Sequence, residues 1–103
     1  EIIMNNNVLG MVRQWQRLFY GKRFSTTTLD KKTNYDMVAE GLGAKAYTVT
    51  TKEEYRAALE AALKETNTPS VINCVIDKDM NVLPMVPGGQ SIEEPILSIE
   101  VDD

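Results

Sequence analysis

The sequence has 103 residues, of which 43% are hydrophobic, and a formal net charge of −4. This length suits one small globular domain, and the acidic balance argues against general nucleic-acid binding. No stretch approaches the roughly 20 apolar residues of a membrane span. Because there is no histidine, an imidazole base or ligand is excluded. The single cysteine, Cys74, excludes an internal disulfide and fits a reducing compartment.

The chain opens on a short apolar run that leads into three carboxamides. Residues 2–4 have the character of the end of a buried strand, and Asn5, Asn6 and Asn7 follow directly. Polar side chains between a strand and a helix lie at the sheet edge where α/β folds bind ligands. An amide oxygen suits Mg²⁺ or Ca²⁺, but a carboxylate or phosphate must supply the charge. No acidic residue occurs between residues 2 and 29, so that partner has to come from elsewhere.

A helix is predicted over residues 8–20, followed by a loop. Gly21 is expected to end this helix, and residues 21–33 form a long polar loop of the kind that serves as a lid or binding segment or is disordered. Four cations are interpreted as a solvated face that complements the helix dipole, with attraction of an anionic substrate or diphosphate as the lesser alternative: Arg13, Arg17, Lys22 and Arg23. Apolar residues recur at helical spacing: Val8, Met11, Val12, Trp15, Leu18 and Phe19.

The middle of the chain predicts a short helix, a strand and a longer helix. Thr33 or Asn34 is expected to cap the short helix, which Gly43 ends, and residues 44–49 are predicted to form a strand. The run from Thr51 to Glu54 matches a capping box at the start of the longer helix. Apolar positions continue along that helix at helical spacing: Tyr55, Ala58, Leu59, Ala62 and Leu63.

The last predicted regular element is a β-branched buried strand over residues 70–76, with Cys74 as a small apolar core residue. The order β-α-α-β-α-β predicts an α/β fold, a partial three-layer parallel sheet covered by helices. Residues 82–89 are apolar but too rich in Pro and Gly for regular structure, so they must lie against another part of the molecule. Residues 91–103 are interpreted as an acidic tail that is solubilising or disordered.

Two blocks of the sequence resemble the catalytic subunits of the acetolactate synthase (acetohydroxyacid synthase) family of thiamine-diphosphate-dependent enzymes. The first is Met-Asn-Asn-Asn-Val-Leu-Gly-Met-Val-Arg-Gln-Trp-Gln at residues 4–16, and the second is Val-Leu-Pro-Met-Val-Pro-Gly-Gly at residues 82–89. The resemblance covers residues 1–90 and implies that they are the second, C-terminal half of the thiamine-diphosphate-binding domain. The chain would then be a C-terminal fragment that is inactive alone.

In that family, an upstream Gly-Asp-Gly motif and the Asn-Asn pair together bind Mg²⁺ and the cofactor diphosphate. The resemblance implies that Asn6 gives its side-chain oxygen to Mg²⁺ and Val8 its backbone carbonyl, with Gly10 and Met11 at the cofactor. The aspartate that completes the site would lie before the first residue of this chain. Without the resemblance, a run of Asn after a strand is more often a turn than a metal site.

The same resemblance places Met11, Val12 and Trp15 at the substrate pocket, where Trp15 would favour 2-oxobutyrate as the acceptor. By its spacing alone, Trp15 would instead be a core residue. Of the other amides, Asn5 is expected to make structural hydrogen bonds and Asn7 to face solvent. The Pro-Met-Val-Pro-Gly-Gly segment at residues 84–89 would belong to a C-terminal arm that folds over the cofactor.

The implied reaction is decarboxylation of pyruvate on thiamine diphosphate, followed by transfer of the two-carbon unit to a second 2-oxo acid. The parent would also bind FAD, assemble as a homo-oligomer with active sites between subunits, use a regulatory small subunit, and reside in the cytoplasm, or in the plastid of a plant. No nucleic-acid or membrane partner is expected. Two alternatives stay open: another thiamine-diphosphate-dependent decarboxylase or carboligase, and a free-standing α/β binding module.

Overall fold

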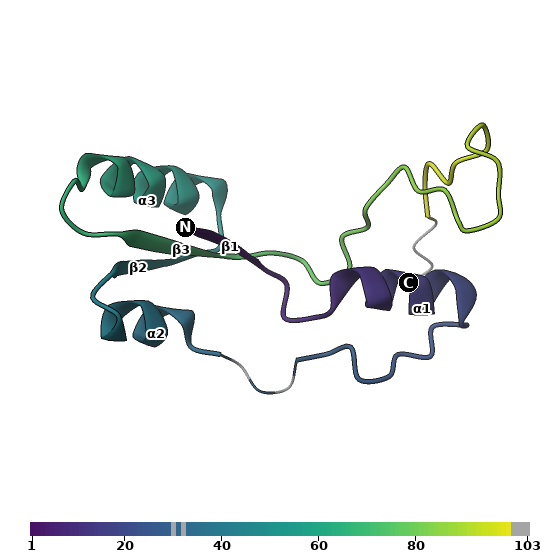
Figure 1. Cartoon of the computed structure of the whole chain (residues 1–103), viewed down its shortest axis with the longest axis horizontal. Coiled ribbons are helices and arrows are strands. Elements are labelled where there is room, and N and C mark those ends of the chain that lie inside the picture. The colour runs from purple at the N-terminus through teal and green to yellow at the C-terminus, as the bar shows by residue number, and fades with distance from the viewer. Residues whose placement is uncertain (30, 32, 100–103) are drawn as a thin grey trace.

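The structure is a computed structural model that describes residues 1–29, 31 and 33–99 (Figure 1). The predicted α/β class and the order β-α-α-β-α-β are both confirmed. Three of the acidic tail positions, Glu100, Asp102 and Asp103, lie outside the described residues. The six elements are β1 (Ile2–Asn5), α1 (Gly10–Phe19), α2 (Tyr35–Gly41), β2 (Lys45–Val49), α3 (Lys52–Lys64) and β3 (Ser70–Val75).

The three strands form one parallel sheet in the order β1-β3-β2. Because β3 is central, its Ile72 pairs with Ile2 on one side and with Tyr47 on the other. All three strands run the same way, so their carboxyl ends meet at one edge of the sheet. The amide run of the sequence, which begins at Asn5, starts at that edge.

The core lies between the sheet and α3, whereas α2 covers the opposite face (Figure 1). Ile72 is 2% exposed and is the centre of this core. The prediction that Cys74 is a buried apolar residue is confirmed. The core residues are Val49, Ala58, Ile72 and Cys74, with Tyr47, Tyr55, Leu59 and Ala62 packed against them.

Local capping explains where the two helices beside the sheet begin. Asn34, one of the two predicted caps, accepts a hydrogen bond from the Met37 N–H at 3.1 Å and starts α2. The predicted capping box of α3 is confirmed, because the Glu54 N–H donates to Thr51 Oγ1 at 3.2 Å and the Glu54 carboxylate accepts from the Thr51 N–H at 3.1 Å. A hydrogen bond from the Thr50 N–H is the main reason that the pKa of Glu54 is lowered.

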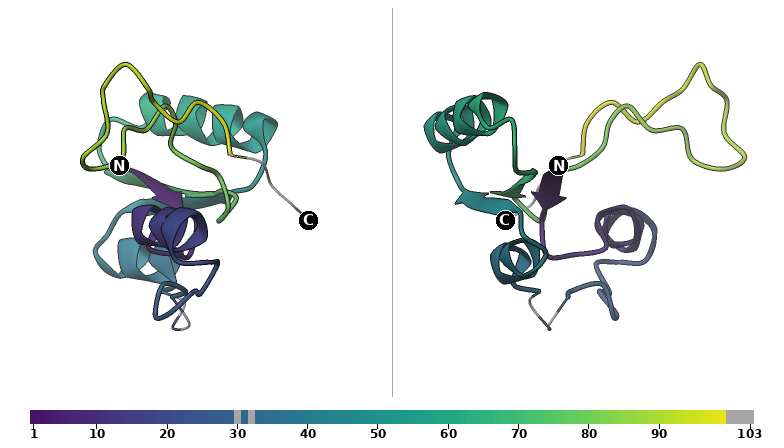
Figure 2. Two further views of the ribbon diagram at one scale, coloured as in Figure 1. Left: turned by 90° about the vertical axis from the view of Figure 1, so that its right-hand side faces the viewer. Right: turned by 60° about the vertical axis from the view of Figure 1, so that its left-hand side comes forward.

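Helix α1 begins at Gly10, two residues later than predicted, because Val8 forms an antiparallel bridge with Thr28 and is therefore extended. The helix ends as predicted, with Gly21 at a φ of 60° just after the C-cap residue Tyr20. Among the described elements, α1 contacts no other helix or strand. It lies to one side of the sheet and is joined to it by loops (Figures 1 and 2).

The segment after β3 continues away from the sheet, passes over α1 and then turns on itself (Figures 1 and 2). Met85 and Ile96 form an antiparallel bridge with hydrogen bonds of 2.8 and 3.0 Å. Residues 91–103 are interpreted from the sequence as a tail that is solubilising or disordered, and within it Ile96 pairs with Met85. We call residues 77–99 the C-terminal segment.

The molecule is elongated. Its radius of gyration is 17.5 Å, against about 13 Å for a compact domain of this length. The reason is that α1 and the C-terminal segment extend beyond the sheet instead of packing on it (Figure 1). Within the described part of the chain, no helix has the length and hydrophobicity needed to cross a membrane.

Candidate functional site

The three amides that follow β1 form two successive turns closed by their own side chains. Asn5 Oδ1 accepts from the Asn7 N–H at 3.1 Å, and Asn6 Oδ1 accepts from the Val8 N–H at 3.2 Å. Asn5 therefore makes the structural hydrogen bond expected of it. Asn7 adopts a left-handed φ of 55°, which Asn tolerates better than most residues, and it is half-buried rather than fully exposed to solvent. We call residues 5–10 the amide turn.

The polar loop of residues 21–29 holds the amide turn in place from outside. The Leu9 N–H donates to the Thr27 carbonyl at 2.8 Å, and the Leu29 N–H donates to the Asn7 carbonyl at 3.0 Å. Thr27 is 2% exposed, and its hydroxyl donates to Gln16 Oε1 at 3.1 Å. Because this loop pairs with the amide turn on one side and with α1 on the other, it connects the two parts of the site.

Gly10 marks the point where the amide turn enters α1. A Cβ built at Gly10 would lie 2.9 Å from Nδ2 of Asn6, closer than real Cβ contacts. The helix start has no side-chain cap and no acidic residue in its first turn. The amide of Asn6 thus lies directly against the positive end of a helix that carries no anion of its own.

The buried side of α1 is its polar side, which the apolar pattern did not predict. Gln14 is 4% exposed. Its Nε2 donates to the Val82 carbonyl at 3.1 Å, and its Oε1 accepts from the Val82 N–H at 2.7 Å. One amide side chain thereby pairs with both backbone groups of one residue and fastens the C-terminal segment to α1.

Arg13 and Arg17 also lie on the buried side of α1, so their interpretation as a solvated face is wrong. Both guanidinium groups pair with the Asp79 carboxylate, Arg13 through its Nε at 2.9 Å. The Arg13 hydrogen bond is the main reason that the pKa of Asp79 is lowered. Arg13 also lies 3.9 Å from the ring centroid of Phe24. No sequence signal marks these pairs, because Asp79 is more than 60 residues away from both arginines.

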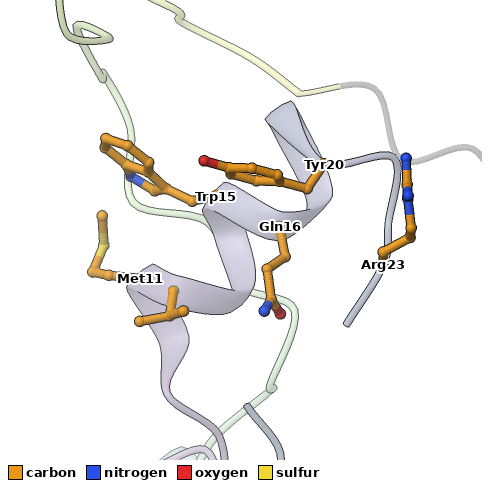
Figure 3. A pocket seen from close by; sticks show the side chains of 6 residues that line it. Met11, Trp15, Gln16, Tyr20 and Arg23 are labelled. Carbon is orange, nitrogen blue, oxygen red and sulfur yellow. The ribbon is translucent and has the colours of Figure 1, made fainter. Parts of the chain in front are cut away.

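The opposite, apolar side of α1 faces a cavity of about 650 Å³ (Figure 3). Its lining residues are Met11, Val12, Trp15, Gln16, Tyr20 and Arg23. The structure therefore brings together Met11, Val12 and Trp15, the three residues assigned to the substrate pocket. The Trp15 ring meets Phe19 edge to face at 5.5 Å. Tyr20 and Arg23 lie at the far end of the cavity (Figure 3) and were not among the predicted pocket residues.

Trp15 is 44% exposed, and Met11 and Val12 are about half exposed. The spacing alone predicted a core position for Trp15, which is wrong, because its ring is partly exposed and lines the cavity. A periodic apolar stripe shows which side chains share a helix face, but it does not show whether that face meets the core or a cavity. Large apolar side chains around an open cavity are typical of a small-molecule site.

Comparison with known proteins gives a consistent result. Residues 1–74 match the model of the family described as thiamine pyrophosphate enzyme, C-terminal TPP binding domain. The chain is 39% identical over 93 residues to acetolactate synthase isozyme 2 large subunit of Escherichia coli. It is 44% identical over 93 residues to acetolactate synthase large subunit of Corynebacterium glutamicum, and 42% identical over 98 residues to the mitochondrial catalytic subunit of acetolactate synthase of Saccharomyces cerevisiae.

These alignments cover 86–90% of this chain but only 13–17% of each relative. The region that matches the family model includes the amide turn, all of α1 and all of the sheet except Val75, the last residue of β3. The chain therefore belongs to the thiamine pyrophosphate enzyme family, through the C-terminal TPP-binding domain of these enzymes.

Proposed function

We propose that this chain is the C-terminal part of an acetolactate synthase catalytic subunit. The complete enzyme would condense two pyruvates, or pyruvate and 2-oxobutyrate, with release of CO₂ in branched-chain amino-acid biosynthesis. The observation that carries the proposal is the junction at Gly10, where the amide turn passes directly into the helix that lines the cavity. The identity of 39–44% to three acetolactate synthases supports this reaction over another thiamine-diphosphate-dependent decarboxylation.

The donor chemistry of the amide turn fits one half of a magnesium–diphosphate site. Asn6 and Val8 offer the neutral oxygen ligands that Mg²⁺ accepts, and the start of α1 carries no anion that would compete with a diphosphate. Within residues 1–29, 31 and 33–99, no three His, Cys, Asp or Glu side chains group together in a way that could hold a metal ion. A carboxylate from another part of the enzyme would therefore have to complete the ligand set.

In this proposal each residue of the site has a distinct role. Asn6 and Val8 hold Mg²⁺, and Gly10 and Met11 lie beside the diphosphate. Thiamine diphosphate, when bound, supplies the carbanion chemistry for decarboxylation and carbon–carbon bond formation. Met11 also forms the wall of the acceptor pocket.

Val12 and Trp15 complete that wall with Met11. An apolar wall stabilises the longer alkyl group of 2-oxobutyrate more than the methyl group of pyruvate. The pocket residues thereby bind and orient the acceptor, and the choice between acceptors depends on how much alkyl surface they cover.

We further propose the wider organisation of the enzyme. Residues 1–90 would form the C-terminal half of the thiamine-diphosphate-binding domain, and residues 91–103 a C-terminal tail. Two of the relatives are named large subunits, which supports a smaller regulatory partner. The enzyme would bind FAD in a domain outside this chain, assemble as a homo-oligomer with active sites between subunits, and act in the cytoplasm, or in the plastid of a plant.

Product analysis tests the proposal. The enzyme that contains this chain is expected to convert pyruvate to acetolactate, and pyruvate with 2-oxobutyrate to acetohydroxybutyrate, in the presence of Mg²⁺ and thiamine diphosphate. Substitution Trp15→Leu is expected to reduce the preference for 2-oxobutyrate over pyruvate by about tenfold, the usual value of one methylene in an apolar pocket. Formation of a free aldehyde as the main product would instead assign the enzyme to the decarboxylases.

A further inference from the structure

The contact between Gly10 and Asn6 has a consequence for the site. A Cβ at Gly10 would lie 2.9 Å from Asn6 Nδ2, and apart from the adjacent residues and the backbone of α1 itself, no other atom of the described residues lies within 4 Å of it. The atom that would have to move is therefore the end of a side chain and not the backbone. A larger residue at Gly10 would displace the Asn6 amide group while leaving the turn and the helix intact.

Other contacts hold the Asn6 amide from the opposite end. Its Oδ1 accepts the Val8 N–H at 3.2 Å, so the oxygen end is tied to the turn while the nitrogen end rests on Gly10. The backbone on both sides is fixed, because Leu9 and Leu29 are hydrogen-bonded across the loop. Because the turn is fixed, the space left by the missing side chain of Gly10 determines the orientation that the Asn6 amide group can adopt.

We infer that Gly10 is a positioning residue, which by its lack of a side chain sets the orientation of the Asn6 amide at the proposed cofactor site. The cofactor role of the Asn6 amide rests on the proposed function, whereas the steric contact between Gly10 and Asn6 does not. Residues that orient a metal ligand typically change metal affinity by about 10- to 100-fold when they are altered. The requirement for glycine here is steric, because its conformation lies outside the left-handed region where glycine is favoured.

The chain offers a matched control in Gly41. It is also a helical glycine, at the end of α2, and a Cβ there would meet no atom of the described residues within 4 Å, apart from its chain neighbours and the backbone of its own helix. Gly10→Ala and Gly41→Ala therefore make the same chemical change in a helix, and only the first places a methyl group against Asn6. Any difference between the two variants isolates the contact with the amide.

Nuclear magnetic resonance of the full chain tests the inference directly. The side-chain amide signals of Asn6 are expected to shift in Gly10→Ala and to stay in place in Gly41→Ala, with the sheet signals unchanged in both. Unchanged Asn6 signals in Gly10→Ala would overturn the inference. This comparison needs no ligand, so it decides the positioning role even if the proposed function fails.

A second measurement adds the cofactor. Mn²⁺ with thiamine diphosphate is titrated into the complete enzyme that carries each variant, and paramagnetic broadening of the Asn6 side-chain signals is followed. Gly10→Ala is expected to need about tenfold more Mn²⁺ for the same broadening, and Gly41→Ala the same amount as the unaltered enzyme. An absence of broadening in the unaltered complete enzyme, which also supplies the completing carboxylate, would contradict the proposed function and leave the positioning result standing.

A double substitution separates positioning from general damage. In the background of Asn6→Ala there is no amide to displace, so Gly10→Ala is expected to have no further effect on Mn²⁺ broadening of the neighbouring Val8 signals. If Gly10→Ala weakens binding equally with and without the Asn6 amide, residue 10 acts through another route and the inference is wrong.

Discussion

The core between the sheet and α3 and the packed side of α1 bury opposite kinds of side chain. Between the sheet and α3, the buried groups are apolar and centre on Ile72 and Cys74. Around α1, the buried groups are polar and charged, namely Gln14 with the arginines that meet Asp79. The large apolar side chains of α1 are instead half exposed at the cavity.

The difference shows how one short chain supplies both a scaffold and a site. Burial of apolar side chains stabilises the sheet region and requires no bound ligand. Around α1 the polar contacts fix the position of the helix, which leaves its apolar face available for a small molecule. The packing of α1 therefore agrees with a binding role better than with a structural one.

Substitution Ile72→Ala is expected to have the largest effect on stability. Ile72 is 2% exposed, so removing its side chain costs about 2–5 kcal/mol of unfolding free energy. Urea denaturation followed by circular dichroism measures the loss. Ile2 is paired with Ile72 but is 46% exposed, so Ile2→Ala serves as a control that is expected to cost about 1 kcal/mol. Equal costs at both positions would contradict the apolar core described for the sheet.

Substitution Asp79→Asn is expected to have an intermediate effect, centred on α1. It removes the charge that Arg13 and Arg17 share while leaving a similar shape, and loss of hydrogen bonds to charged groups costs about 1–3 kcal/mol. The Val82 N–H donates a hydrogen bond to Gln14 Oε1. Its hydrogen exchange is expected to accelerate, because the C-terminal segment loosens. The amide of Ile72 is the internal control, and its exchange should not change.

The ion pairs of Asp79 with Arg13 and Arg17 predict that the stability of the chain depends on pH. The pKa of Asp79 is lowered below its ordinary value of 3.8, mainly by the Arg13 hydrogen bond. Its stabilising contribution is therefore fully present above about pH 4, decreases as the pH falls below that value, and is lost once the pH passes the lowered pKa. The difference in unfolding free energy between the unaltered chain and Asp79→Asn should shrink over this acidic range. A constant difference down to pH 2 would show that the carboxylate charge is not what stabilises α1.

Substitution Trp15→Ala is expected to have the smallest effect on stability. Because Trp15 is 44% exposed and its ring meets that of Phe19 at the surface of α1, we expect a loss of less than about 1 kcal/mol, well below the 3–5 kcal/mol of a buried tryptophan. Urea denaturation again provides the measurement. A loss as large as that of Ile72→Ala would make Trp15 a core residue and remove the contrast between the two regions.

Local sequence signals predict the features that are formed by residues close together in the chain. The capping box at Thr51, the stop at Gly21 and the strand around Cys74 each involve residues a few positions apart, and all three are confirmed. The start of α1 was missed because Val8 pairs with Thr28 across the loop. A backbone bridge between distant residues can keep a residue extended even where the apolar spacing predicts a helix, because spacing reflects only residues close in the sequence.

The polar contacts of α1 could not be predicted for the same reason. Gln14 meets Val82 and Arg13 meets Asp79 across more than 60 residues of sequence. The pocket residues Met11 and Trp15 were identified through the family resemblance, since their spacing alone also fitted a core helix. Gly10 was assigned to the cofactor by position, whereas its contact with the Asn6 amide became visible only in three dimensions.

The position of Trp15 also makes the molecule its own optical probe. Trp15 is the only tryptophan in the sequence, and its ring lines the cavity (Figure 3). Fluorescence excited at the red edge of the indole band would thus come from a single ring at the cavity, without a signal from the sheet. A small molecule entering the cavity would alter the intensity or wavelength of that emission, so occupancy can be followed in unlabelled protein.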